Sequence, residues 1–577
     1  MITETQPIEA SRRKALWLRP EWFAALALFL ATAGVVLWQN SQFGSLWDIS
    51  FLLEHASRIA AGQLPYRDFP FPYTPITFAI QAAILKFTGR VYFHHVLYGA
   101  FIGGLASVLT WRVIFNLLRG AVPAAKVAAF FLSVPLIVLG VTCIFPHPFY
   151  DSDCTCEILL TILLLQKAER MEFPPIRSLL AGAMLVIPIF IKQNMGIAFF
   201  VSAAGALLVL IGIAAVRHRP WAGYVWILAG AGAGLILALG IVQISVGLNN
   251  YIHWTVEFAA SRRLPALTGL IRLYWGKSLL PWLAALSIGI ALHRMNRSNS
   301  RRIAILSGFL ISLPFTFIAI YSQVNPDQFA RLGAFLALWP FVLIAATLLA
   351  LSQLRRVSGV NLVLPFLLLA TINGSILSQH FKGSTYALWP FFMILVAICI
   401  AGVSHKGFSF PQILPVTGAI GVSMFLAGGW YAFSHMRMDY VDVTDGALVR
   451  SNLPALSGLA LRGRWNPDFD ELVRFSEREI PFEDSILVLP GEDLFYYATG
   501  RRPQFPVLSF DHTLNPYNPE TILALTRERQ TRWLIVKRNL QLKTEPIEEK
   551  DKLLGLLEQD FRKTASLNNY DIYRRNE

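Results

Sequence analysis

The chain has 577 residues, of which 55% are hydrophobic and 15% are charged, and its mean hydropathy is +0.50. Soluble globular domains carry about 25% charged residues, so this composition excludes an ordinary soluble protein and indicates a polytopic membrane protein. The net charge of +14 is uneven: residues 1–433 hold 30 Lys and Arg against 13 Asp and Glu, and residues 434–577 hold 20 against 23. Because the basic residues fall in short loops between apolar runs, they indicate membrane topology and not a nucleic-acid partner.

The first apolar run, at residues 22–38, follows three basic residues at 12–14, and no small-residue cleavage site comes after it. It is predicted to be an uncleaved first span whose N-terminus lies in the cytoplasm. The stretch 46–75 is polar and broken by prolines, which places it in a large first outer loop at 40–92. Within that loop, residues 76–85 are apolar but too short to span, so an interfacial or re-entrant helix is expected.

Apolar runs long enough to span, with Lys and Arg placed in the cytoplasmic loops, predict about thirteen transmembrane helices. They are expected near residues 22–39, 93–116, 123–145, 155–166, 178–191, 195–216, 222–247, 277–293, 303–321, 329–351, 360–378, 386–403 and 412–433. A second outer loop, PHPFYDSDCTCE, follows the span at 123–145. Because the number of spans is odd, the C-terminal tail is predicted to lie outside.

The tail is predicted to be a small extracytoplasmic mixed α/β domain. DSILVLP and RWLIVK have the pattern of buried strands, and YDIYR that of an exposed strand. NPETILALTRER has a helix start signal, and EEKDKLLGLLEQDFRK has helical spacing at Leu553, Leu554, Leu557 and Phe561. The predicted fold is thus an all-α polytopic membrane protein with a cytoplasmic segment 1–21, a transmembrane domain 22–433 and an α/β domain 434–577.

Charged residues of the membrane part gather on the predicted outer side. No carboxylate falls in the middle of a span, where an ion-coupled transporter usually keeps one. Basic residues on that side run against the positive-inside bias; they are Arg58, Arg67, Lys86, Arg90, Lys192, Arg262, Arg263, Arg272, Lys277, Arg331 and Lys382. Carboxylates and bases together suit a site that deprotonates a hydroxyl and neutralises a phosphate leaving group, although any single base can instead contact lipid headgroups.

Two acidic clusters are the candidates for chemistry. Asp48 follows Trp47 just outside the first span, where it can cap a helix at 49–62 and also act as a base. His55 is expected to pack on a face of that helix. Asp151 and Asp153 lie in the second outer loop near His147 and the pair Cys154-x-Cys156. This cysteine spacing is not that of a structural zinc site, whereas the carboxylates could bind a divalent cation or support a base, so the metal stays unknown.

These motifs resemble the GT-C superfamily of polyprenyl-phosphate-sugar glycosyltransferases, most closely the protein O-mannosyltransferase and aminoarabinose-transferase type. The resemblance is carried by Trp47-Asp48, AAGQLPYRDFPFPYTPITF, HPFYDSD, the IKQN tip at 191–194 and DLFYYATGRRP. Many relatives have Asp-Glu where this chain has Asp48-Ile49, and either Asp151 or Asp153 could match their second-loop aspartate. The resemblance implies that Asp48 is the base, or a carboxylate that orients the acceptor, in an inverting transfer.

It also implies that Lys192 and the outer arginines neutralise the lipid phosphate that leaves. The predicted catalytic residues are Asp48, Asp151 and Asp153, and the predicted substrate-binding residues are Arg58, Arg67, Asp68, His147, Lys192, Gln193, Arg262, Arg263 and Lys382. No cofactor is assigned, and a divalent cation is left open.

The expected partners are a polyprenyl-phosphate sugar, a lipid, protein or glycan acceptor, and the lipids of a bacterial inner membrane. The alternatives are a lipid-linked glycan ligase, polymerase or flippase, and a secondary transporter, whose internal repeats the sequence lacks on inspection.

Overall fold

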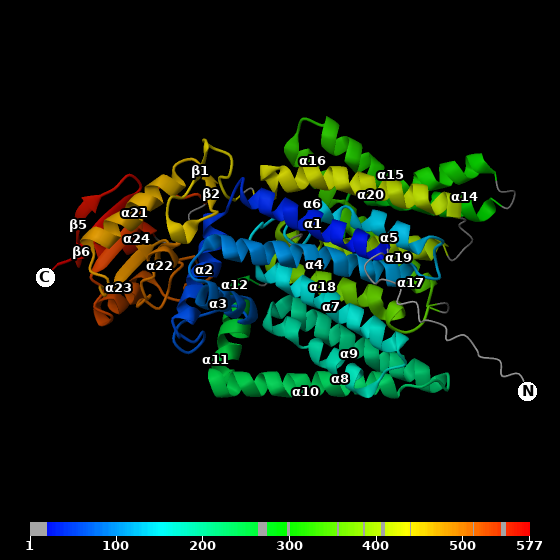
Figure 1. Cartoon of the computed structure of the whole chain (residues 1–577), viewed down its shortest axis with the longest axis horizontal. Coiled ribbons are helices and arrows are strands. Elements are labelled where there is room, and N and C mark those ends of the chain that lie inside the picture. Colours follow the sequence, from blue (N-terminus) through cyan, green and yellow to red (C-terminus); the bar gives the residue numbers. More distant parts are fainter. Residues whose placement is uncertain are drawn as a thin grey trace, which may run out of the picture.

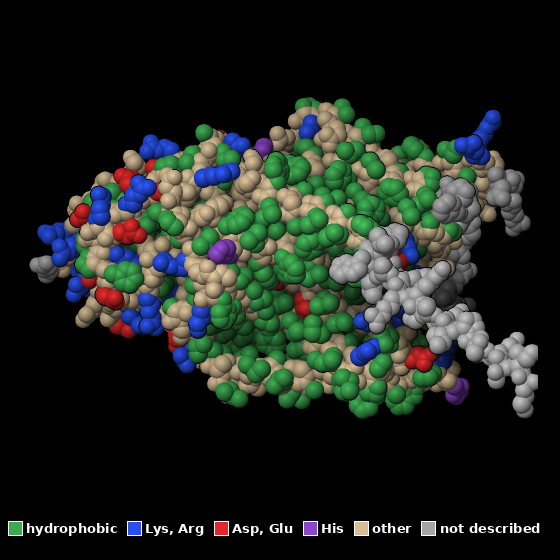
Figure 2. Space-filling model, viewed as in Figure 1, with side chains coloured by type: hydrophobic (Ala, Val, Ile, Leu, Met, Phe, Trp, Pro, Cys, Tyr) green, Lys and Arg blue, Asp and Glu red, His purple; other side chains and the backbone are tan. Residues whose placement is uncertain are grey.

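The computed structural model describes residues 20–263, 274–296, 300–354, 357–384, 387–404, 410–438, 440–511, 513–543 and 550–576. It is an elongated molecule in which a large helical bundle carries a smaller mixed α/β region at one end (Figure 1). Hydrophobic side chains cover much of the visible surface of the bundle, whereas Lys, Arg, Asp and Glu are dense on the α/β end (Figure 2). This distribution is the one expected of a bundle in lipid with one water-exposed end.

By length and composition, eight helices among the described residues could cross a membrane. They are α1 (Pro20–Asn40), α4 (Tyr92–Leu118), α9 (Gln193–Val216), α10 (Ala222–Ser245), α15 (Arg301–Val324), α16 with α17 (Gln328–Leu336 and Leu338–Ser352), α18 (Val360–Ser384) and α20 (Phe410–Phe433). Shorter apolar helices are α3 (Ile76–Thr88), α8 (Pro175–Met184) with the turn that follows it, α14 (Leu279–Met295) and α19 (Trp389–Ser404). The protein is therefore a multi-pass membrane protein, while the number thirteen and the orientation stay predictions.

The region between α4 and α9 differs from the prediction. The sequence predicts one continuous span at 123–145, but the structure has α5 (Ala125–Ser133), α6 (Leu136–Leu139) and then no helix until α7 (Tyr150–Arg170). Pro135 has no backbone N–H with which to continue the helix, so the run breaks there. α7 in turn begins earlier than the predicted span at 155–166, which places the second-loop carboxylates in the first turn of a helix.

Small residues let the membrane helices approach closely. A Cβ atom on Gly182 of α8 would lie 1.9 Å from the carbonyl oxygen of Ile227 in α10, and one on Gly230 would lie 2.1 Å from that of Leu179. Only glycine fits at these two crossings, so α8 and α10 pack backbone to backbone, as is common in lipid.

The α/β region contains a four-stranded sheet of order β3-β4-β6-β5, made of β3 (Ile486–Leu489), β4 (Trp533–Lys537), β6 (Tyr570–Arg575) and β5 (Phe561–Ser566). β3 and β4 are parallel and the other neighbours are antiparallel. The other elements of this region are α21 (Trp465–Glu479), α22 (Phe495–Thr499), α23 (Pro519–Glu528), α24 (Lys550–Leu557) and the ribbon of β1 (Leu448–Arg450) and β2 (Ala460–Arg462). The predicted small C-terminal sheet is confirmed, and the boundary at residue 434 stays a prediction.

Two expectations for this region are wrong. The strand from Tyr570 is not exposed, because β6 lies between β4 and β5, and Tyr570 and Ile572 are fully buried. Phe561 is not on the helix with Leu557, because α24 ends there and Phe561 begins β5, paired with Arg575. The side chains of Leu557 and Phe561 still belong to the same buried hydrophobic cluster. The helical spacing therefore predicted their burial correctly, but not that Phe561 lies on a strand.

Candidate active site

The stretch after α1 forms α2 (Leu46–Ala60), which lies with α3 at the junction of the bundle and the α/β region (Figure 1). It is enclosed on most sides: Ser50 donates to the carbonyl oxygens of Gly491 and Asp493 at 3.0 and 2.8 Å, and Glu54 accepts from the backbone N–H of Tyr497 at 3.0 Å. α2 is thus fastened to the C-terminal region along its length, and a residue in its first turn has a defined position.

Asp48 lies in that first turn but does not cap the helix. The cap position belongs to Ser45, whose hydroxyl donates to the Asp48 carboxylate at 2.5 Å, so the predicted capping role is wrong. The same carboxylate oxygen accepts a hydrogen bond from the hydroxyl of Tyr440 at 2.7 Å. Burial raises the pKa of Asp48 to about 6, although both hydrogen bonds lower it. Such a carboxyl is ionised at neutral pH and remains basic enough to accept a proton.

Asp151 and Lys192 form a buried ion pair between α7 and α9. Their side chains are 2% and 4% exposed, and the Lys192 ammonium also lies 5.7 Å from the centre of the Tyr150 ring. Lys192 is the residue before α9, so the ion pair lies at a helix start. The first N–H groups of a helix have no partner within it. Removing two charges from water costs free energy that their attraction repays only in part, so a buried ion pair stabilises a fold weakly. Stability alone therefore does not explain why this pair is placed at a helix start.

Asp153 points to different partners. It accepts hydrogen bonds from the hydroxyls of Thr77 in α3 at 2.6 Å and Tyr98 in α4 at 3.0 Å. It therefore joins α7 to two neighbouring helices, whereas Asp151 is the second-loop carboxylate that contacts Lys192.

A cavity of about 190 Å³ lies beside this ion pair. It is lined by Pro72, Tyr73, Tyr150, Lys192, Gln193, Asn194, Ile197, Thr255, Val256, Ala259, Ala260, Leu377 and Thr513. The Gln193 amide donates to the carbonyl oxygens of Pro72 and Thr255, each at 3.3 Å, and so holds the first loop against the turn His253–Phe258. The cavity thus has a polar head at the start of α9 and apolar walls along the helices.

Aromatic rings connect the cavity to α2. Phe51, one helical turn beyond Asp48, has its ring centre 4.7 Å from that of Tyr73, and Tyr73 lies 5.4 Å from Tyr150. Tyr73 and Tyr150 both line the cavity. The helix that carries Asp48 therefore packs directly against the cavity wall.

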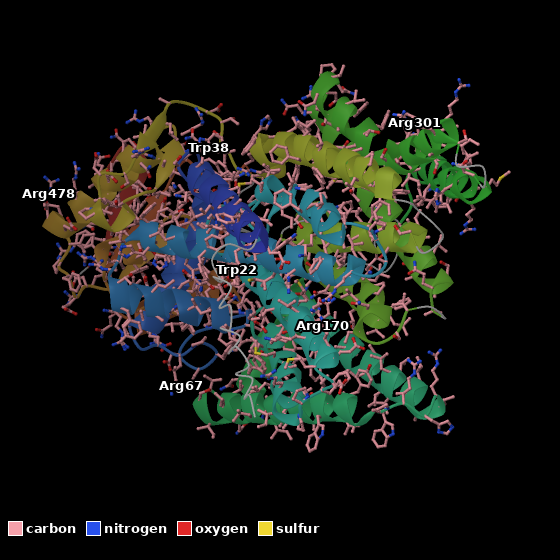
Figure 3. All side chains as sticks on the ribbon, turned by 45° about the vertical axis from the view of Figure 1, so that its right-hand side comes forward. Trp22, Trp38, Arg67, Arg170, Arg301 and Arg478 are labelled. Carbon is pink, nitrogen blue, oxygen red and sulfur yellow. The ribbon has the colours of Figure 1, made fainter. Side chains whose placement is uncertain are left out.

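Three predicted binding residues of the first loop lie elsewhere. Arg58 is fully buried, donates to Gln63 and to the carbonyl oxygen of Pro506, and lies 4.3 Å over the ring of Phe69. It fastens α2 to the C-terminal region. Arg67 and Asp68 form a 2.8 Å ion pair at the surface, with side chains 54% and 31% exposed (Figure 3). None of these three lines the cavity.

Of the other predicted binding residues, Lys192 and Gln193 line the cavity, whereas His147 and Arg262 do not. His147 is buried between Phe145 and Phe149, and Arg262 is exposed with its guanidinium 5.3 Å from the Phe258 ring centre. The side chains of Arg263 and Lys382 lie outside the described residues. His55 packs among Phe51, Phe69 and Phe71 on a helix face, which confirms that expectation.

Two residues after the last span were missed by the sequence reasoning. Tyr440 contacts Asp48, and Arg437 donates to the carbonyl oxygen of Cys143 at 2.6 Å while lying 3.9 Å over the ring of Phe43. Arg437 is a buried cation that joins the starts of the first and second loops. The sequence signals Arg437 in one way: it is a basic residue at the predicted outer end of a span, where the positive-inside bias disfavours Lys and Arg.

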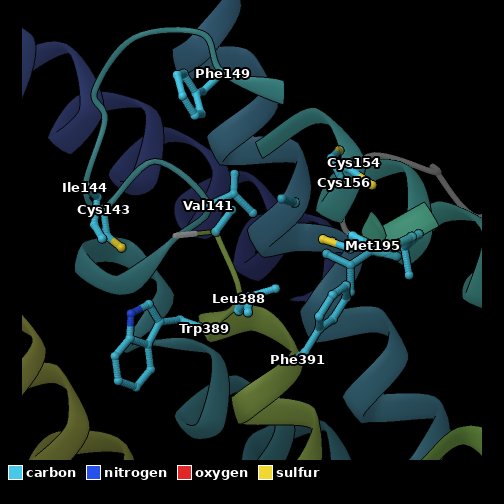
Figure 4. Close-up of a cluster of buried hydrophobic side chains, with 14 of the residues drawn as sticks. Val141, Cys143, Ile144, Phe149, Cys154, Cys156, Met195, Leu388, Trp389 and Phe391 are labelled. Carbon is cyan, nitrogen blue, oxygen red and sulfur yellow. The ribbon is translucent and has the colours of Figure 1, made fainter. Parts of the chain in front are cut away.

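Protein donors engage the two second-loop carboxylates to different extents. Lys192 donates to one oxygen of Asp151, whose other oxygen is buried without a hydrogen-bond partner, whereas two hydroxyls occupy both oxygens of Asp153. Cys154 and Cys156 lie together on α7, whereas Cys143 lies on a separate segment (Figure 4). Within the described ranges, no group of three or more His, Cys, Asp or Glu side chains could hold an ion.

No protein-family model and no curated protein matches the chain. Solved structures do match, at low sequence identity. ArnT from Cupriavidus metallidurans bound to undecaprenyl phosphate shares 12% identity and a TM-score of 0.44, over 95% of this chain and 97% of ArnT. The Archaeoglobus fulgidus oligosaccharyltransferase in complex with zinc and sulfate shares 12% identity and a TM-score of 0.47, over 95% of this chain and 72% of that protein.

The arabinosyltransferase EmbB from Mycobacterium smegmatis shares 16% identity and a TM-score of 0.31, over 77% of this chain and 46% of EmbB. These are proteins to which the chain is similar. Its own function is inferred below from the residues of the site.

Proposed function

We propose that the chain is an integral-membrane glycosyltransferase. It transfers a sugar from a polyprenyl-phosphate donor to a hydroxyl acceptor with inversion, on the extracytoplasmic side of a bacterial inner membrane. The observation that carries the proposal is the cavity beside the Asp151–Lys192 pair, which combines a buried cation and a helix start with apolar walls.

The polar head of the cavity suits the donor phosphate. Lys192 supplies a positive charge, and α9 starts at the next residue with N–H groups that have no partner within the helix, an arrangement that favours anions. Asp151 holds the lysine ammonium in place and keeps it neutralised until a phosphate enters. As the bond to the sugar breaks, the charge that develops on the phosphate falls next to this cation, where it is stabilised most.

The apolar walls suit the polyprenyl chain. Ile197, Val256 and Leu377 line the cavity on the side of the helices, and each offers only hydrocarbon. A lipid-linked phosphate with its tail among these side chains keeps its charged head at the start of α9. A soluble nucleotide sugar would leave the same walls uncovered, so a lipid-linked donor fits better.

Asp48 is the proposed base. In a single displacement, the acceptor oxygen bonds to the anomeric carbon from the side opposite the phosphate, and the carbon–oxygen bond to the phosphate breaks. Asp48 takes the hydroxyl proton, and polyprenyl phosphate leaves as an anion beside Lys192. Because α2 packs against the cavity wall through Phe51 and Tyr73, the sugar is proposed to lie between Asp48 and the phosphate.

The test is turnover of a labelled polyprenyl-phosphate sugar by the purified protein. Asp48→Asn keeps the shape of the side chain and removes the base, so the rate is expected to fall by about 10²- to 10⁴-fold. Asp68→Asn, which alters a surface ion pair, is the matched control and is expected to keep its activity. An unchanged rate in Asp48→Asn would remove Asp48 from the mechanism. If the protein instead turns over a polyprenyl-pyrophosphate-linked glycan and releases polyprenyl pyrophosphate, it is a glycan ligase or polymerase.

A further inference from the structure

A second cavity lies at the other end of the bundle. Its volume is about 340 Å³, and the ends of α4 and α17 and the beginning of α18 surround it together with α19. α4 begins next to the α/β region, where Phe93 donates its N–H to the carbonyl oxygen of Ser457, and ends at Leu118. Its 27 residues span about 40 Å, so this cavity is separate from the candidate active site.

The walls of this cavity change from polar to apolar with depth. Arg119, Ser358 and Asn361 line it at the helix ends, together with Gln353. Leu362, Pro365 and Ile398 line its apolar part, on the candidate membrane helix α18 and on the apolar helix α19. A ligand that matches both parts has a charged or polar head and a hydrocarbon portion.

The polar part carries an excess of positive charge. Arg170, at the end of α7, lies close enough to Arg112 and Arg119 to be repelled by both. Glu21 offsets Arg112 at 3.6 Å, but no carboxylate pairs with Arg119 or Arg170 in the part of the chain that the structure describes. The nearby Glu169 is already engaged, because it accepts from the backbone N–H of Val360 at 3.0 Å and from the hydroxyl of Tyr224 at 3.2 Å.

A ladder of amides fixes one wall. Asn116 donates to Gln166 at 2.9 Å, and Gln166 donates to the side-chain oxygen of Asn361 at 2.9 Å, so the ladder crosses from α4 through α7 to α18. Because the oxygen of Asn361 faces Gln166, its NH₂ group is the part of the amide left to donate at the cavity wall. The cavity therefore offers hydrogen-bond donors beside the guanidinium group of Arg119, and the positive charge of Arg170 lies nearby.

We propose that this cavity binds the phosphate headgroup of an anionic phospholipid from the membrane leaflet at this end of the bundle. Guanidinium, amide and hydroxyl donors match phosphate oxygens, and basic pockets between membrane helices are suited to such headgroups. The apolar depth takes the glycerol and the first carbons of the acyl chains. A free phosphate ion would leave that depth uncovered, which is why a lipid is the occupant.

The experiment uses the full chain in a neutral detergent and measures binding by native mass spectrometry and by the shift of Tm. Dioleoyl phosphatidylglycerol is the probe, with dioleoyl phosphatidylcholine and glycerol 3-phosphate as comparisons. The wild type is expected to bind phosphatidylglycerol with a rise in Tm that neither comparison compound reproduces. Arg119→Gln is expected to weaken binding roughly tenfold, because one charge-assisted contact is lost.

The matched control is Arg301→Gln, which removes an exposed arginine at the start of α15 and is expected to bind as the wild type does (Figure 3). Equal weakening in Arg119→Gln and Arg301→Gln would mean that general surface charge attracts the lipid, and would overturn the site. An equal rise in Tm with glycerol 3-phosphate would overturn the lipid as occupant. None of these readouts depends on transferase activity, so the experiment tests the lipid site independently of the proposed function.

Discussion

The hydroxyl of Tyr440 donates a 2.7 Å hydrogen bond to the carboxylate of Asp48, a residue 392 positions earlier in the chain. Tyr440 follows the last membrane helix, and Asp48 lies in the first turn of α2. The two ends of the membrane part therefore meet at the carboxylate proposed as the base. This hydrogen bond favours the ionised form of Asp48, against the burial that disfavours it.

Replacing Tyr440 with Phe is expected to move the pH dependence of catalysis. A hydrogen bond to a charged group contributes about 1.5 kcal/mol and one pKa unit corresponds to about 1.4 kcal/mol, so the pKa of Asp48 should rise from about 6 by about one unit. Because the base must be ionised, the acid limb of the kcat/KM profile should move upward by the same amount, with little change at pH 9. Tyr321→Phe, in α15, is the control. An equal loss of activity at every pH would contradict this tuning.

The buried pair of Asp151 and Lys192 predicts a non-additive pair of substitutions. Lys192→Met leaves the Asp151 charge buried without its partner, and Asp151→Asn does the same to Lys192, so each should lower the free energy of unfolding by about 3–5 kcal/mol. The double variant removes both charges and should recover most of the thermal stability. Its KM for the donor should stay high, because the cation for the phosphate is absent. Recovery of donor binding together with stability would contradict the role of Lys192.

Parts of this site could be predicted from local sequence. The IKQN tip carries Lys192 and Gln193, which both line the cavity, and the acidic run YDSD carries Asp151. The helical start of that run was missed because its carboxylates interrupt the apolar pattern. Acidic residues are nevertheless favoured in the first turn of a helix, where they face its positive end.

Other parts could not be predicted. The first loop holds three charged residues that were predicted to bind the substrate, Arg58, Arg67 and Asp68. Only the tertiary packing shows that Arg58 lies in the core and that Arg67 and Asp68 lie at the surface. The contacts of Tyr440 with Asp48 and of Arg437 with Cys143 join segments hundreds of residues apart. No local periodicity contains information on such contacts.

Glu54 predicts a pH dependence of stability. Burial raises its pKa from 4.5 to about 8, so the folded protein holds a proton at neutral pH that the unfolded chain releases. Stability should therefore fall as the pH rises from about 4.5 to about 8 and level off above that. Glu54→Gln is neutral in both states and should remove this slope, giving a higher Tm than the wild type at pH 8. Asp68→Asn is the control, and a slope that persists in Glu54→Gln would assign it to another group.

Gln541 connects the C-terminal sheet region to the start of α2. Gln541 accepts from the N–H of Leu46 at 2.8 Å and donates to the carbonyl oxygen of Gly44 at 3.1 Å. The backbone N–H of Gln541 donates to the carboxylate of Glu492 at 2.9 Å, and the ammonium of the buried Lys537 donates to the same carboxylate at 2.7 Å. A buried ion cluster of the sheet region therefore fixes the turn that carries Asp48.

Gln541→Leu leaves two buried backbone groups unpaired, which costs about 1–3 kcal/mol each, and frees the start of α2. Both Tm and kcat should fall, whereas the KM for the donor should change little, because Gln541 does not line the cavity that holds the phosphate. Gln504→Leu, which alters an exposed glutamine of the same region, should leave all three values unchanged. A raised KM with an unchanged kcat would show that Gln541 acts on donor binding and not on the position of Asp48.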